Sequence, residues 1–237
     1  MVNPFMPSTS TSTRTITLDQ GLRQHMMRVY NYMGIGLILT GLVAYIVANT
    51  ALAGLIFGGN KLVAYAAMFS PLVYIMVMSW KMHKVSASTA QTLFWGFCAL
   101  MGLSMSTIFL AFTETSIARA FFITAGTFMG MSLWGYTTKK DLTSMGSFLM
   151  MGVIGILLAM IVNIFMQSDM MQWIVSVLGV AIFTGLTAYD TQNIKRSYSE
   201  RLPQETNNKL AVMGALRLYL NFINAFQFLL SLMGNRN

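Results

Sequence analysis

The charged residues of this chain divide it into seven long segments that contain no charge. The segments have between 18 and 32 residues each. An α-helix rises about 1.5 Å per residue, so roughly 20 apolar residues cross the hydrocarbon core of a bilayer. Each segment therefore suits one crossing, which predicts seven transmembrane helices. The segments are Val29–Asn60, Leu62–Trp80, Val85–Thr113, Ala120–Thr138, Leu142–Ser168, Met170–Tyr189 and Leu218–Asn235.

The composition agrees with lipid as the surrounding medium. Hydrophobic residues make up 55% of the chain and charged residues 9%, whereas a soluble domain is about 25% charged. We therefore expect an all-α membrane protein with its transmembrane domain at residues 29–233, a lipid bilayer as its surroundings and no nucleic-acid partner, despite the net charge of +8. The single cysteine, Cys98, excludes an intrachain disulfide, and His25 and His83 are far apart, so we expect no cofactor.

The basic residues predict the orientation of the chain. With the N-terminus in the cytoplasm, the inner segments carry eleven Lys and Arg residues and the outer segments three, a bias that places the C-terminus outside. Residues 1–28 lack the apolar core of a signal peptide, and we interpret them as a disordered cytoplasmic tail. Their hydroxyl-rich, Arg-bearing composition is also typical of a mitochondrial transit peptide, so a mitochondrial inner membrane is the alternative location. In the fourth segment, Gly126 and Gly130 have the spacing that permits close helix packing, which is a weak signal.

Polar residues form a stripe along the last helix. Arg217, Asn221, Asn224, Gln227 and Ser231 fall within an arc of about 120° and extend over about 21 Å of helix. A stripe of this length is too costly to face hydrocarbon. We infer that the last helix is central and that its stripe faces other helices or a water-filled cavity. Interhelical hydrogen bonding alone, without a functional site, is the alternative explanation.

Asp190 is the second polar residue that is unusual for its position. It ends the apolar run of the sixth segment, and no cation lies three or four residues away on the same helix. The carboxylate therefore needs water, a bound cation or a partner on another helix, and Arg217 and Asn221 are the candidates. A solvated carboxylate at a helix end is the alternative.

The residues of the last two segments resemble the Bax inhibitor-1 family, also called the transmembrane Bax inhibitor motif family, and the chain is most similar to its bacterial members. The resemblance is carried by Tyr189–Lys195, Ala215–Asn224 and Lys139–Leu142. It implies six helices around a central C-terminal helix, a place in the bacterial inner membrane, and a calcium-leak channel gated by a pH-sensitive pair of aspartates. It also implies a basic residue near the end of the second helix that pairs with the gate, for which Lys81 and Lys84 are the candidates.

The chain departs from this family pattern at the gate. Asp190 matches the first aspartate, but the second position is Asn221. Two carboxylates that share a proton make a sharp pH switch, and a single one does not. Ca²⁺ prefers several oxygen ligands, so Asp190 is expected to hold Ca²⁺ weakly.

Three functions remain to be compared. The first is a cation-leak pathway with Asp190 as gate or ligand, opposite Arg217 and Asn221, and with Asn224 further along the pathway. The second is a non-conducting regulator that binds other membrane proteins, such as a membrane AAA protease, in a stress response. The third, an intramembrane protease, needs two carboxylates or a histidine within the spans; the sequence has neither, so we expect no enzymatic activity.

Overall fold

The computed structural model describes residues 9–82 and 84–235. This part of the chain is helical and contains no strand. His83 and residues 1–8 lie outside the described residues. The helices are α1 (Thr9–Ala48), α2 (Ala51–Phe57), α3 (Lys61–Met82), α4 (Ala87–Ala111), α5 (Glu114–Thr137), α6 (Thr143–Met166), α7 (Asp169–Ser197) and α8 (Gln204–Met233).

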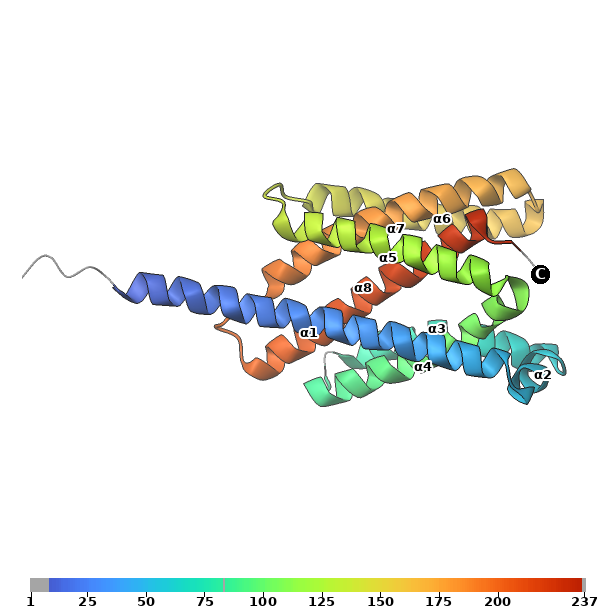
Figure 1. The fold of residues 1–237 in the computed structure, drawn as a ribbon, viewed down its shortest axis with the longest axis horizontal. Helices are drawn as coiled ribbons and strands as arrows, with labels where there is room; N and C mark the ends of the chain where they lie inside the picture. Colours follow the sequence, from blue (N-terminus) through green and yellow to red (C-terminus); the bar gives the residue numbers. More distant parts are fainter. Residues whose placement is uncertain (1–8, 83, 236–237) are drawn as a thin grey trace, which may run out of the picture.

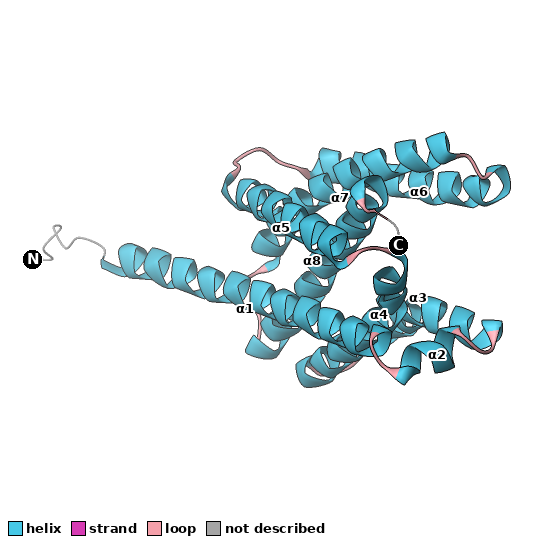
Figure 2. Cartoon of the chain, turned by 45° about the vertical axis from the view of Figure 1, so that its right-hand side comes forward, coloured by secondary structure: helices cyan, strands magenta, loops and turns pink. Residues whose placement is uncertain are grey.

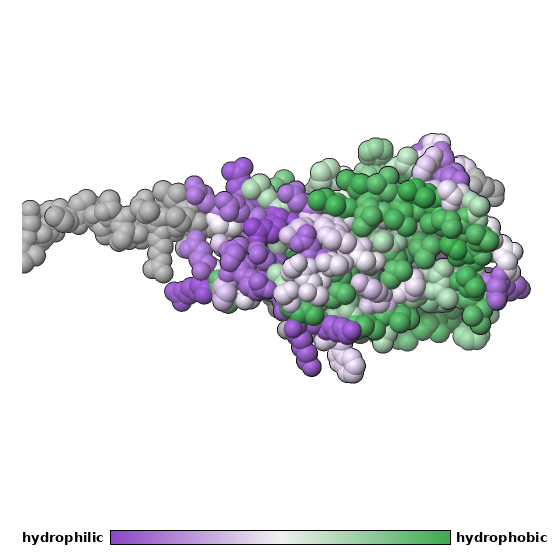
Figure 3. Space-filling model, turned by 90° about the horizontal axis from the view of Figure 1, so that it is seen from below, coloured by the Kyte–Doolittle hydropathy of each residue, from purple (hydrophilic) through white to green (hydrophobic). Residues whose placement is uncertain are grey.

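Seven of these helices are long and apolar enough to cross a membrane. The predicted all-α class and the predicted number of spans are therefore confirmed. The exception is α2, a seven-residue helix with no buried residue, which occupies the Gly-rich stretch after the first span. On the face that Figure 3 shows, hydrophobic residues cover much of the bundle, and hydrophilic residues gather mainly at the end from which α1 extends, with fewer at the opposite end.

The start of α1 differs from the expected unstructured tail. The helix already begins at Thr9, well before the predicted boundary at residue 28. His25 and Met26 are each only 4% exposed, and the His25 ring lies 5.2 Å from the ring of Tyr198, just beyond α7. A side chain of the α7–α8 connection therefore covers part of α1, and a sequence pattern does not show such a contact.

The helices form two layers with α8 between them. Helices α1, α3 and α4 pack together on one side, α5, α6 and α7 pack together on the other, and α8 crosses between the layers (Figures 1 and 2). It contacts α1, α4, α5 and α7, and its Leu218 and Tyr219 are fully buried. The expectation of a central last helix is therefore confirmed.

Tyr219 contacts two other helices at the centre of the bundle. Its hydroxyl hydrogen-bonds the Thr40 hydroxyl at 2.6 Å, and Thr40 donates to the Cys98 carbonyl at 2.9 Å. The rings of Phe94 and Phe97 pack edge-on against the Tyr219 ring, each with a centroid separation of 5.9 Å. One buried phenol therefore joins α1, α4 and α8.

Close packing on α5 occurs away from the predicted glycine pair. Gly126 and Gly130 are exposed, and a Cβ atom added at either would meet nothing within 4 Å. At Gly135, an added Cβ would lie 2.2 Å from the carbonyl oxygen of Ala188. The backbones of α5 and α7 therefore approach each other at Gly135, and this contact fixes the part of α7 that carries Asp190.

Candidate functional site

Asp190 lies inside α7, which continues beyond it to Ser197. The residue is 8% exposed. The alternative of a solvated carboxylate at a helix end is therefore wrong. Burial of an acid in a helix interior is costly unless other groups bind it, so the neighbours of this carboxylate define the site.

Two side chains of α8 approach the Asp190 carboxylate. The Asn221 amide donates to Oδ2 at 2.7 Å, and an Arg217 guanidinium nitrogen lies 4.0 Å from Oδ1. The Arg217 side chain is 50% exposed and that of Asp190 is 12% exposed. The acid is thus enclosed between α7 and α8, while its cation sits at the edge. The sequence paired Asp190 with these two residues, and the structure brings all three together.

The rest of the polar stripe turns toward a separate cavity of about 430 Å³ between α6, α7 and α8. Asn224, Gln227 and Ser231 line it from α8. Its other polar lining residues are Asn163, Gln172 and Ser176, and its apolar lining includes Ile156, Leu157, Met160, Phe183 and Phe228.

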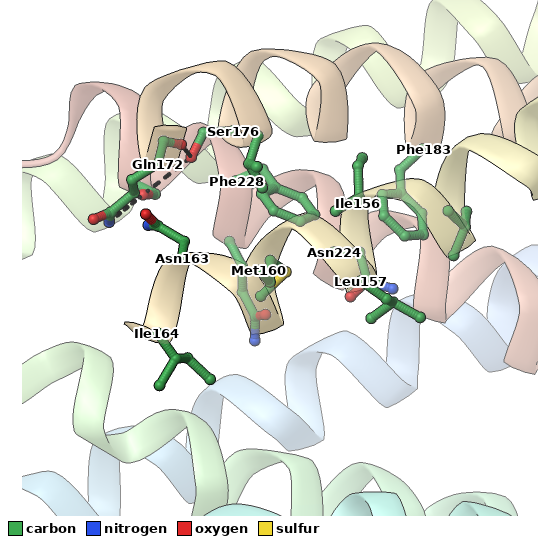
Figure 4. A pocket seen from close by; sticks show the side chains of 14 residues that line it. Ile156, Leu157, Met160, Asn163, Ile164, Gln172, Ser176, Phe183, Asn224 and Phe228 are labelled. Atoms are coloured by element: carbon green, nitrogen blue, oxygen red, sulfur yellow. Dashed lines mark hydrogen bonds between the residues drawn. The ribbon is translucent and has the colours of Figure 1, made fainter. Parts of the chain in front are cut away.

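The polar side chains gather toward one end of this cavity. Gln172 and Ser176 are within hydrogen-bonding distance of the Ser231 hydroxyl, at 3.4 and 3.3 Å. In Figure 4, Gln172 and Asn163 lie near one end, and Asn224 lies near the other. Asn224, predicted as a site residue, therefore belongs to the cavity and not to the Asp190 group.

The expected basic partner from the second span is not at the site. Lys81 and Lys84 are exposed, and α3 packs mainly against α4, in the layer opposite α7. The only cation within 4.0 Å of Asp190 among the described residues is Arg217. The structure therefore does not bring Lys81 or Lys84 to Asp190, because the layer order separates the ends of α3 and α7.

The residues that follow Asp190 anchor α7, and the sequence analysis did not single them out. The Thr191 hydroxyl pairs with that of Ser132 at 3.0 Å, and Ser132 pairs in turn with the Tyr30 hydroxyl. The Gln192 side chain donates to the Lys140 carbonyl at 2.8 Å and accepts from the backbone amide of Leu142 at 2.9 Å. The sequence did contain a signal for these contacts. The polar residues that follow Asp190 lie on all sides of the helix, which predicts polar contacts in several directions.

An ion pair fixes the α5–α6 connection to the end of α7. Arg196 donates to Asp141 at 2.7 Å. The Thr143 hydroxyl and amide also bind the Asp141 carboxylate. Hydrogen bonds from Thr143 and then from Arg196 lower the pKa of Asp141 from 3.8 to about 2.

The metal-binding capacity of the site is small. Residues 9–82 and 84–235 contain no group of three or more His, Cys, Asp or Glu side chains that could hold a metal ion. A cation at Asp190 would find one carboxylate and the Asn221 amide oxygen, provided that the amide turned over. Weak Ca²⁺ binding at Asp190 stays a prediction.

A bundle of seven apolar helices with a buried acid between its last two helices defines an integral membrane protein with a polar intramembrane site. A family model described as inhibitor of apoptosis-promoting Bax1 matches residues 22–237. Among curated proteins, the inner membrane protein YbhL of Escherichia coli is 43% identical over 91% of this chain and 93% of its own. An uncharacterized protein of Caulobacter vibrioides is 44% identical over 92% of this chain and 91% of its own. One of Rickettsia prowazekii is 41% identical over 98% of both. The chain belongs to the Bax inhibitor-1 family.

Proposed function

We propose that this protein is a cation-leak pathway of the bacterial inner membrane, with Asp190 as its gate. The observation that carries the proposal is the buried Asp190 carboxylate, held by Asn221 and Arg217 at one end of a polar stripe. The same stripe leads along α8 to the cavity lined by Asn224 and Ser231. The location is supported by the inner membrane relative, and the basic-residue bias supports a cytoplasmic N-terminus.

The arrangement corresponds to a closed state. The Asn221 amide and the Arg217 guanidinium join α7 to α8 through the acid, and a cation that enters must replace both. Arg217 also repels an approaching cation. Since a single carboxylate cannot share a proton with a second one, the gate responds to pH over a broad range and not as a sharp switch. Ca²⁺ is the cation that the family resemblance implies.

Calcium flux into proteoliposomes tests the gate. Arg217→Gln removes the partner of Asp190, and we expect faster flux, because the closed state loses an ion pair. A half-exposed pair is worth about 1 kcal/mol, which corresponds to a change of about fivefold. Asp190→Asn breaks the same ion pair but also removes the carboxylate that would bind the cation, so its flux should stay below that of Arg217→Gln. Lys81→Gln changes the same charge at an exposed residue of α3 and should leave the flux unchanged. Equal flux from all four proteins would refute the proposal.

The second candidate is a non-conducting regulator that binds other membrane proteins, such as a membrane AAA protease, in a stress response. It is favoured by one observation: α1 extends well beyond the bundle (Figure 1), which offers a helix for contact with a partner. In this case the protein would act without moving ions and without catalysis. Crosslinking in native membranes from the extended part of α1 tests it, and flux that depends on Asp190 would favour the first candidate.

A further inference from the structure

Two cavities lie along one seam between α1 and α5. The first, which we call the Arg23 cavity, measures about 650 Å³ and is lined by residues of α1 and α5. The second, the Glu114 cavity, measures about 370 Å³ and is lined by α1, α4, α5 and α8. On α1 the lining residues extend from Arg23 to Tyr45, which is about 33 Å of helix and close to the thickness of a bilayer core.

Aromatic rings form the wall of the seam. Phe128 of α5 lines the Arg23 cavity, and Phe222 of α8 lines the Glu114 cavity. Their ring centroids are 5.7 Å apart, and Phe121 lies 5.5 Å from Phe222. The wall is therefore continuous between the two cavities. Outside it, Met129 and Leu133 are each 65% exposed, so the seam opens sideways toward lipid.

The two ends of the seam carry opposite charges. Among the described residues, Arg23 is the one charged residue that lines its cavity, and the Lys195 ammonium lies 4.7 Å from the centre of the Tyr136 ring in the same lining. At the other end, the lining that the structure describes has Glu114 as its one charged residue. An anionic group is therefore attracted to the Arg23 end and repelled from the Glu114 end.

We propose that the seam binds one phospholipid with an anionic headgroup. The headgroup phosphate lies at Arg23, and an acyl chain lies along the seam against Phe128 and Phe222. The paired hydroxyls of Tyr30 and Ser132 line the Arg23 cavity, and when Ser132 donates to Tyr30, the Tyr30 hydroxyl can donate to an ester oxygen of the lipid. Basic pockets between transmembrane helices on the cytoplasmic side are suited to anionic headgroups, and the basic-residue count assigns the Arg23 end to that side. This site is independent of the proposed ion pathway, which lies between α7 and α8.

Photocrosslinking of the full chain in vesicles tests this proposal. The vesicles contain equal parts of phosphatidylglycerol and phosphatidylcholine, and a diazirine on an acyl chain of one lipid or the other marks the peptides that it contacts. We expect phosphatidylglycerol to label the seam peptides of α1 and α5 more strongly than phosphatidylcholine. One surface cation contributes about 1 kcal/mol, so Arg23→Gln should lower this preference about fivefold. Lys81→Gln removes an exposed base of α3 that lines neither cavity and should leave it unchanged.

Glycine variants test the acyl chain separately from the headgroup. Gly41 lines the Glu114 cavity, and a Cβ atom added there meets nothing within 4 Å, so Gly41→Leu places a larger side chain at the cavity lining. We expect it to reduce labelling of the seam by both lipids. Gly126→Leu adds the same side chain at an exposed position that lines neither cavity and should leave the labelling unchanged.

Four results would overturn the proposal. The first is equal labelling of the wild type by the two lipids, and the second is the same loss of lipid preference in Arg23→Gln and in Lys81→Gln. The third is labelling of Gly41→Leu as strong as that of the wild type. The fourth is loss of the lipid preference when soluble glycerol phosphate is added as a competitor.

Discussion

Replacement of Gly135 by alanine tests how α7 is positioned. The added Cβ would lie 2.2 Å from the Ala188 carbonyl oxygen and 2.8 Å from its carbonyl carbon. These are backbone atoms, so α5 and α7 must move apart. Overpacking costs about 1–3 kcal/mol, and we expect the upper value because no side chain can rotate away. The better helix propensity of alanine returns about 1 kcal/mol, so the net loss of stability should be about 2 kcal/mol.

The matched control is Gly126→Ala on the same helix. An added Cβ there meets nothing within 4 Å, so this variant should gain up to about 1 kcal/mol from helix propensity alone. Reversible unfolding in mixed micelles should therefore separate the two variants by about 3 kcal/mol. If Gly135→Ala proves as stable as Gly126→Ala, the close approach of α5 to α7 is wrong, and the position of Asp190 loses its support.

Two further predictions concern polar contacts. Arg196→Gln should raise the pKa of Asp141 from about 2 toward 3.8, and only part of the way, because Thr143 binds the carboxylate more strongly; carboxyl carbon NMR measures this. Since the pKa of Asp141 is lowered in the folded protein, its contribution to the stability of the fold is present above pH 3.8 and disappears as the pH falls through about 2. If the pKa of Asp141 is the same in Arg196→Gln as in the wild type, the contact with Arg196 is wrong. Thr40→Val should destabilise the bundle by about 1–3 kcal/mol, because it removes the hydroxyl that pairs with the buried Tyr219 hydroxyl. Tyr219→Phe should cost a similar amount and the double variant no more than either, whereas additive losses would show that the two hydroxyls do not act together.

The spans and the central helix could be predicted from the sequence because both follow from the cost of placing polar groups in lipid. Seven charge-free segments leave one crossing each, and a long polar stripe excludes a peripheral place for α8. The same reasoning paired Asp190 with Arg217 and Asn221, since a buried acid without a cation on its own helix needs a partner on another helix. The role of these residues as a gate stays a prediction.

Contacts between distant segments could not be predicted. The order of the layers decides that Lys81 and Lys84 lie away from Asp190, and no periodicity encodes that order. The glycine pair at Gly126 and Gly130 has the spacing of a packing motif, but it faces outward, while Gly135 makes the close contact. Helix spacing shows which residues share a face and does not show which helix that face meets.

The central position of α8 has a consequence for how the protein is made. The chain is synthesised from its N-terminus, so α8 enters the membrane after α1 to α7. Until it arrives, Thr40 lacks the Tyr219 hydroxyl and Asp190 lacks both of its partners. The six membrane-spanning helices before α8 therefore enter the lipid with an acid that lacks its partners, and the thirty residues of α8 supply them. A nascent chain interrupted before residue 204 would therefore differ from the finished protein by an Asp190 carboxylate that has neither of its α8 partners.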